Sequence, residues 1–229
     1  MKITVIHGQS HKGSTYNIAK QLCDKLDGEV TEFFLPKDFE GYCKGCTACF
    51  IKETRCPDYE KIKPLTEALD EADVIILASP VYVMHATGAM KSFLDHYGYR
   101  YMVHRPEEKM FLKQAVCIST AAGAGMKSAI KDMADSTFFW GCARTYKLGV
   151  AVMETRWEMV RPKIKRKIDK KTDLLAKRIL SRAGKVKPTV KTRVFFNIMS
   201  MVQKKGFNEA DVNYWKAKGW TSGKKPWIN

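Results

Sequence analysis

Four cysteines in one short segment are the residues of this chain best suited to redox or metal chemistry. Residues 42–57 read YCKGCTACFIKETRCP, which spaces the thiols as C-x2-C-x2-C-x6-C. Four thiolates can hold an iron–sulfur cluster or zinc, and a C-x-x-C pair can act as redox thiols. The segment can also be a tight loop without metal. Zinc is disfavoured because it usually takes two cysteine pairs separated by a longer loop. The four residues are Cys43, Cys46, Cys49 and Cys56.

A second candidate site is the loop HGQSHKGSTYN, residues 7–17. It combines hydroxyl groups and a lysine with the amino end of an expected helix, whose unpaired N–H groups and dipole attract anions. It contains neither the dinucleotide fingerprint G-x-G-x-x-G nor a Walker A sequence. The loop therefore predicts a phosphate site, with an ordinary capped turn as the alternative. The phosphate candidates are Ser10, Lys12, Ser14 and Thr15.

The elements that must position these loops alternate along the chain. Short apolar runs rich in β-branched residues predict strands at 2–8, 29–35, 73–82, 113–120 and 145–153. Helical periodicity predicts helices between them at 14–26, 59–72, 86–98 and 126–141. This alternation predicts an α/β fold with a doubly wound, five-stranded parallel sheet. Ligands bind such sheets beyond the carboxyl ends of the strands, so we expect loops 9–15, 80–85 and 120–126 to meet there.

Charge is unevenly divided along the 229 residues. Residues 1–155 carry 19 Lys and Arg against 19 Asp and Glu, whereas residues 156–229 carry 21 against 5, a net charge of +16. We therefore expect a neutral domain over 1–155 and a basic helical C-terminal extension over 156–229. Within the extension, residues 159–184 predict a long basic amphipathic helix, and VFFNIMSMVQK at 194–204 is a second apolar segment.

Composition also disfavours several classes of protein. The sequence has no run of about 18 apolar residues, which argues against a membrane span. The first residues, MKITVIHGQS, lack the apolar core of a signal peptide, so we expect a cytoplasmic protein with reduced thiols. No nucleic-acid recognition sequence is present, and basic charge alone predicts only non-specific binding to nucleic acid.

Residues 79–96, SPVYVMHATGAMKSFLDH, resemble the flavodoxin-like NAD(P)H-dependent FMN reductases, whose pattern here is SPVYxxxxxGxMKxFxDR. TAAGAG at 120–125 is similar to the Gly-rich loop that follows the fourth strand in that family. The chain departs from the family at Gln9, His11 and His96, where a serine and two arginines are usual. The resemblance extends over residues 2–153. The residues that match the family's first loop are Gly8, Lys12, Gly13, Ser14 and Thr15.

The resemblance implies strand order 2-1-3-4-5, FMN as cofactor and NAD(P)H as electron donor. It also implies a homodimer, and electrons would pass to a small-molecule or protein acceptor that the sequence does not identify. Because the flavin carries the chemistry, no catalytic side chain is expected. Pro80 should keep the chain extended and leave the following N–H groups free to face the flavin ring. The residues expected at the ring are Pro80, Val81, Tyr82, Val83, Thr120, Ala121, Ala122, Gly123 and Gly125.

Two alternatives remain open. Iron–sulfur flavoproteins of the same superfamily carry a compact cysteine sequence at this place. The resemblance therefore also implies a [4Fe–4S] cluster on the four cysteines, with ferredoxin as donor, in competition with structural or redox thiols and zinc. The other alternative is a non-enzymatic flavin- or metal-binding module docked by its basic tail. For the extension we favour packing, with the long helix covering the sheet and the remainder on a second subunit. Contact with a membrane surface or a partner is the alternative.

Overall fold

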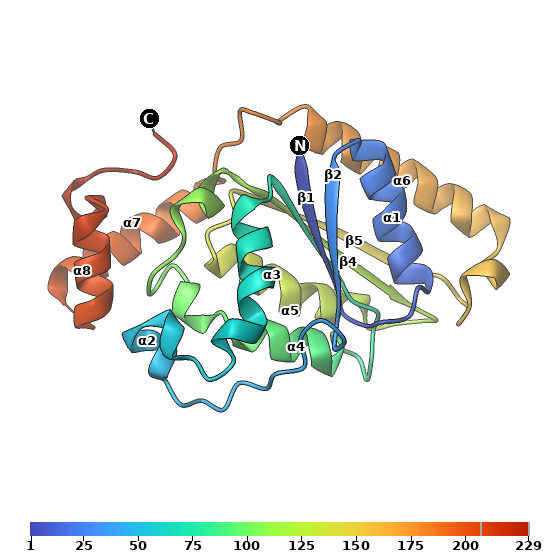
Figure 1. Cartoon of the computed structure of the whole chain (residues 1–229). Coiled ribbons are helices and arrows are strands. Elements are labelled where there is room, and N and C mark those ends of the chain that lie inside the picture. Colours follow the sequence, from blue (N-terminus) through green and yellow to red (C-terminus); the bar gives the residue numbers. More distant parts are fainter. Residues whose placement is uncertain (207, 229) are drawn as a thin grey trace.

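Five parallel strands form one sheet in the order β2-β1-β3-β4-β5 in the computed structural model, which describes residues 1–206 and 208–228 (Figure 1). The predicted flavodoxin-like topology and strand order are confirmed. The central strand β3 is buried at all five positions, as its continuous apolar sequence predicts. It ends before the predicted residue 82. The strands are β1 (Lys2–His7), β2 (Glu29–Phe34), β3 (Val74–Ala78), β4 (Gln114–Ala121) and β5 (Arg144–Ala151).

Helices cover both faces of the sheet and bury two separate apolar layers (Figure 1). One layer lies under α3, α4 and α5, and the other lies under α1 and α6. The helices are α1 (Ser14–Leu26), α2 (Ala48–Ile51), α3 (Tyr59–Glu71), α4 (Gly88–Asp95), α5 (Met126–Phe139), α6 (Pro162–Leu180), α7 (Val190–Lys205) and α8 (Glu209–Ala217).

The first helix of the extension belongs to the core of the protein. Ile168, Leu175 and Ile179 of α6 are buried against the layer that α1 also covers. Lys25 of α1 forms an ion pair with Asp169 of α6 at 2.7 Å. The expectation that the long basic helix covers the sheet is therefore confirmed.

The end of the extension forms a third apolar cluster on the body of the protein. Phe196 of α7 and Trp215 of α8 are fully buried together with Trp220, and Phe196 and Trp220 contact Phe111 from the 3-10 helix before β4. The sequence pattern did not predict α8, whose first turn is capped by Asn208 through a hydrogen bond from the Asp211 N–H. Within residues 1–206 and 208–228, no helix is both long and apolar enough to cross a bilayer.

Candidate functional site

The three loops predicted to meet at the carboxyl edge of the sheet do so. The hydroxyls of Thr15 and Thr120 lie 2.6 Å apart and join the first loop to the third. The Thr87 hydroxyl donates to the Gly8 carbonyl and joins the second loop to the first. The Val81 N–H donates to the Thr120 carbonyl at 2.9 Å. These contacts fix the relative positions of the loops.

The amino end of α1 offers hydrogen-bond donors to an anion. The first N–H groups of a helix have no partner within it, and the residue before α1, Gly13, supplies no side-chain cap. The Ser14 hydroxyl is buried, and among the described residues it has no hydrogen-bond partner. A buried hydroxyl is costly unless it is hydrogen-bonded. Ser14 therefore fits an anionic group, such as a phosphate, at this helix end.

The other phosphate candidates are placed differently. Ser10 donates its hydroxyl to the Leu35 carbonyl at 3.2 Å, which ties the loop to the end of β2. The Lys12 ammonium lies over the Tyr16 and Phe34 rings, at 5.1 and 5.6 Å from their centres. Of the four candidates, Ser14 has a hydroxyl without a partner among the described residues, whereas the Thr15 hydroxyl is already bonded to Thr120.

A strained turn forms the tip of the second loop. Tyr82 and His85 exchange backbone hydrogen bonds of 2.9 and 3.0 Å around Val83 and Met84, whose φ angles are 47° and 68°. Positive φ is unfavourable for a β-branched residue, and such strain tends to persist at functional sites. Val83 is 96% exposed. The turn therefore holds an apolar side chain in solvent at the rim of the loops.

One expectation about this loop is wrong. Pro80 was expected to leave the following N–H groups free for a ligand, but the Val81 N–H donates to Thr120 and the Tyr82 N–H donates to His85. Both amides are used because the chain pairs with β4 and then reverses in the turn. The side chain of Tyr82, which is half exposed, donates its hydroxyl to Gln9 at 3.4 Å.

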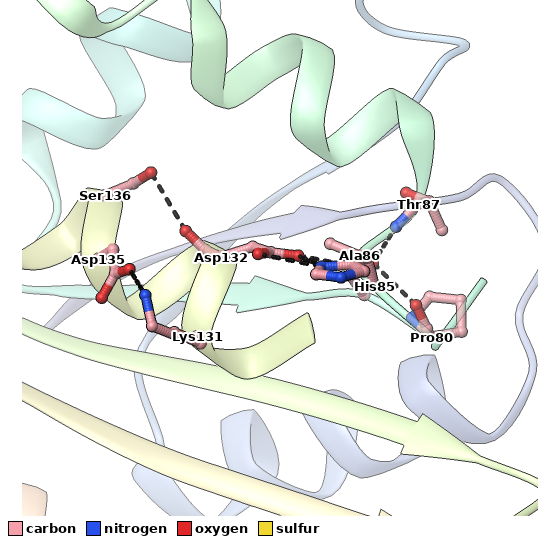
Figure 2. A network of polar contacts seen from close by, with 9 residues as sticks. Pro80, His85, Ala86, Thr87, Lys131, Asp132, Asp135 and Ser136 are labelled. Atoms are coloured by element: carbon pink, nitrogen blue, oxygen red, sulfur yellow. Dashed lines mark hydrogen bonds and ion pairs between the residues drawn. The ribbon is translucent and has the colours of Figure 1, made fainter. Parts of the chain in front are cut away.

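Asp132 of α5 holds this turn in place (Figure 2). Its carboxylate accepts a hydrogen bond of 3.2 Å from the Ala86 N–H and lies 3.0 Å from Nδ1 of His85. Figure 2 shows the two side chains pointing toward each other across the gap between the loop and the helix. The ring of His85 is oriented by a carboxylate, and its side chain is 64% exposed.

The third loop approaches the second at a glycine. Gly125 has φ of 93°, and a Cβ atom there would lie 2.6 Å from a methyl carbon of Val81. Only glycine fits a position with this backbone angle and this close contact. Among the described residues, no atom lies within 4 Å of such a Cβ at Gly123, and Ala122 is exposed. The loop is thus closely packed at Gly125 and open at its tip.

Sequence reasoning missed two residues of this site. Asp132 lies on a helix 46 residues after Ala86, and the local sequence gives no signal of the contact. Thr87 could have been found, because a threonine directly before a helix is a common N-cap. Its side chain accepts from the Met90 N–H at 3.1 Å.

The cysteine segment contains α2 and a 3-10 turn at Glu53–Arg55. All four cysteines line one cavity of about 90 Å³ beside the carboxyl end of α4. In the described part of the chain, no group of three or more His, Cys, Asp or Glu side chains is arranged to hold a metal ion. The donor set suits a thiolate-ligated centre chemically, but the side chains do not converge on one point.

Burial raises the pKa of the Cys49 and Cys56 thiols. Thiols with raised pKa values are poor nucleophiles at neutral pH because little thiolate is present. Cys49 and Cys56 therefore lack the lowered pKa that activates a catalytic redox thiol.

Comparison with known proteins agrees with the fold. An iron-sulfur flavoprotein of Archaeoglobus fulgidus is 31% identical over 98 residues, covering 42% of this chain and 48% of the relative. An NADPH azoreductase of Bacillus sp. (strain OY1-2) is 28% identical over 107 residues, 46% of this chain and 55% of the relative. The chain thus spans about half the length of these curated relatives.

Among solved structures, an azoreductase from Bacillus anthracis superposes with a TM-score of 0.60 at 10% identity, covering 78% of this chain and 99% of that one. This likeness concerns the fold. Residues 1–157 match the family described as NADPH-dependent FMN reductase, which is more than half of the chain. The chain therefore belongs to the NADPH-dependent FMN reductase family.

Proposed function

We propose that the protein is an oxidoreductase that binds FMN at the three loops, takes electrons from NAD(P)H and passes them to a small-molecule or protein acceptor. The observation that carries this proposal is the buried Ser14 hydroxyl at the amino end of α1, which has no hydrogen-bond partner among the described residues and lies next to the contact between Thr15 and Thr120 of the third loop. Membership of the family supports FMN and NAD(P)H as the redox pair. The azoreductase name of one relative favours an aromatic acceptor.

Each loop has a distinct task in this proposal. Ser14, Thr15 and the first N–H groups of α1 would hold the phosphate. The segments 80–83 and 120–125 would contact the flavin ring, and Asp132 would keep the first of them in position. FMN supplies the hydride and electron chemistry when bound. The protein supplies position, and Val83 and Ala122 at the rim of the loops are exposed to an acceptor.

A flavin titration tests the proposal. The purified protein is stripped of flavin, and FMN and riboflavin binding are compared by quenching of flavin fluorescence. Tight FMN binding, with riboflavin at least about tenfold weaker because it lacks the phosphate, is the expected result. NAD(P)H oxidation with an azo dye or a quinone as acceptor then tests turnover. If FMN binds no better than riboflavin, the phosphate site proposed at the amino end of α1 is wrong. If neither flavin binds, the proposal fails.

A second candidate function is electron transfer through an iron–sulfur centre. It is favoured by the shared cavity of Cys43, Cys46, Cys49 and Cys56 and by a relative named iron-sulfur flavoprotein. The cavity lies beside the end of α4, an eight-residue helix about 12 Å long that begins at the flavin loops. Anaerobic purification followed by iron, sulfide and zinc analysis decides the matter. Flavin with iron and sulfide would support a cluster, whereas flavin with zinc or with no metal would exclude it.

We further propose that residues 1–155 bind the flavin and that the protein is a homodimer. The extension, residues 156–229, would not take part in the flavin chemistry. A mass measurement in solution by light scattering tests the dimer. A result of 26.1 kDa, the mass of one chain, would contradict it.

A further inference from the structure

Helix α7 exposes an apolar stripe that the fold does not use. Its inner face is fixed to the protein by Phe196, which is fully buried, and by Gln203, which donates to the Val103 carbonyl at 2.9 Å. Its outer face carries large apolar side chains that are 37% to 67% exposed. Positions three, four and eight residues apart share a helix face. The exposed stripe consists of Val190, Val194, Ile198, Met201 and Val202.

Cations border this stripe, and the surrounding segment carries no acidic residue. Residues 185–205 contain six Lys and Arg and no Asp or Glu. With about 100° between successive residues of a helix, Arg193 and Lys204 flank one side of the stripe. Lys191 falls near Val202 within the stripe, and its ammonium lies over the Phe138 ring, 4.3 Å from the ring centre. Lys205 lies at the end of the stripe. The outer face of α7 is therefore apolar along its middle and positive along one margin and at its carboxyl end.

We propose that α7 docks the protein on the surface of a bilayer that carries anionic lipid headgroups. A helix with an apolar face and basic margins lies in the plane of a membrane interface, where acyl chains accept the apolar residues and anionic headgroups pair with the cations. A second copy of the chain would fit less well, because a symmetric contact between two such faces would bring like charges together. The proposal does not rest on the flavin chemistry.

The position of α7 would allow the protein to dock without covering the proposed flavin site. The residue before α7, Thr189, donates its N–H to the Ala143 carbonyl at 3.1 Å, which places the start of the helix at the amino end of β5. The flavin loops lie at the opposite, carboxyl ends of the strands. Docking through α7 would therefore leave these loops open to the aqueous phase (Figure 1).

Co-sedimentation with vesicles tests the proposal. The full chain is mixed with phosphatidylcholine vesicles containing roughly one-third phosphatidylserine and, separately, with vesicles of phosphatidylcholine alone. We expect binding to the anionic vesicles that weakens as salt is raised. The variant Ile198→Asn/Met201→Asn should bind at least about tenfold more weakly. The control Val30→Thr, at an exposed apolar position on β2, should bind like the unaltered protein.

A charge variant separates the cations of α7 from the net charge of the protein. Arg193→Gln/Lys204→Gln should reduce vesicle binding by about fivefold for each cation, whereas Lys37→Gln/Lys61→Gln, which removes equal charge elsewhere, should have a smaller effect. Melting curves check that every variant is folded. Absence of binding to anionic vesicles, or equal binding by the apolar variant and its control, would overturn the proposal. So would a dimer in solution that the apolar variant dissociates, because the stripe would then face a second copy.

Discussion

Arg105 joins the C-terminal extension to the cysteine segment. Its guanidinium donates one hydrogen bond to the carboxylate of Asp211 and another to the carbonyl of Cys49, each 2.7 Å long. Asp211 on α8 is 1% exposed, and its second oxygen lies 2.7 Å from Nδ1 of His104. A third bond of 2.8 Å reaches the Phe50 carbonyl. The extension therefore braces the cysteine segment through one buried carboxylate.

Asp211→Asn should weaken this brace. The amide has nearly the shape of the carboxylate but no charge, so the buried Arg105 loses its counter-ion. Breaking a buried ion pair from one side costs about 3 kcal/mol of unfolding free energy. We expect a loss of this size in chemical denaturation and faster amide hydrogen exchange over residues 48–51.

The matched control is Asp169→Asn, which breaks the exposed pair with Lys25 in the same extension; the Asp169 side chain is 62% exposed. An exposed pair contributes only about 0–1 kcal/mol. Equal losses of unfolding free energy in the two variants would show that Arg105 does not link the extension to the cysteine segment. Unchanged amide hydrogen exchange over residues 48–51 in Asp211→Asn would show the same.

Ser14→Ala should reduce FMN affinity and leave riboflavin affinity unchanged. A hydrogen bond to a charged group contributes about 1.5–3 kcal/mol, so the dissociation constant for FMN should rise about tenfold or more. The flavin-free variant should be no less stable than the parent, because the hydroxyl has no partner there within the described residues. Ser181→Ala, whose hydroxyl donates to the Arg178 carbonyl far from the loops, is the control. Equal weakening of FMN and riboflavin would place Ser14 away from the phosphate.

Gly125→Ala should damage the flavin site, whereas Gly123→Ala should not. At Gly125 the backbone has φ of 93° and the new methyl group would lie 2.6 Å from Val81, so the second and third loops must separate. At Gly123 the same methyl group meets no atom of the described part of the chain within 4 Å. Flavin fluorescence titrations of the two variants should show at least about tenfold weaker FMN binding for Gly125→Ala alone. Similar affinities would mean that the contact between the loops is not needed for binding.

Asp132→Ala should loosen the second loop. The change removes the acceptor of the Ala86 N–H and the partner of His85, so hydrogen exchange over residues 81–87 should accelerate and FMN affinity should fall several-fold. The control Asp135→Ala lies one turn further along α5 and loses only an exposed pair with Lys131 (Figure 2). If both variants bind FMN alike, the contacts of Asp132 with Ala86 and His85 have no role in holding the flavin loop.

Most of the fold could be predicted because its signals are local. The helix at Ser14–Leu26 agrees with its apolar spacing, and the loops meet because parallel strands end at one edge. Asp132, Arg105 and Asp211 could not be predicted, since their partners lie 46 to 107 residues away in the sequence. α8 was missed because its buried residues, Asp211 and Trp215, do not form an apolar stripe.

Three buried thiols should make the unfolding free energy of the protein fall at alkaline pH. Burial raises the pKa values of Cys23, Cys117 and Cys142 from 9.0 to about 12. In the unfolded chain these thiols ionise near their ordinary pKa, so the unfolded state loses protons first as pH rises. Their contribution to stability is therefore full below about pH 9 and is lost progressively between pH 9 and 12.

Cys117→Ala isolates this effect. One proton released only on unfolding changes the unfolding free energy by about 1.4 kcal/mol per pH unit. Denaturant unfolding between pH 8 and about pH 11 should show a slope that is shallower by up to this amount in the variant. The cavity left by the alanine lowers stability at every pH, so the comparison is between slopes and not between absolute values. Parallel curves would mean that the Cys117 thiol ionises in the folded protein as readily as in the unfolded chain.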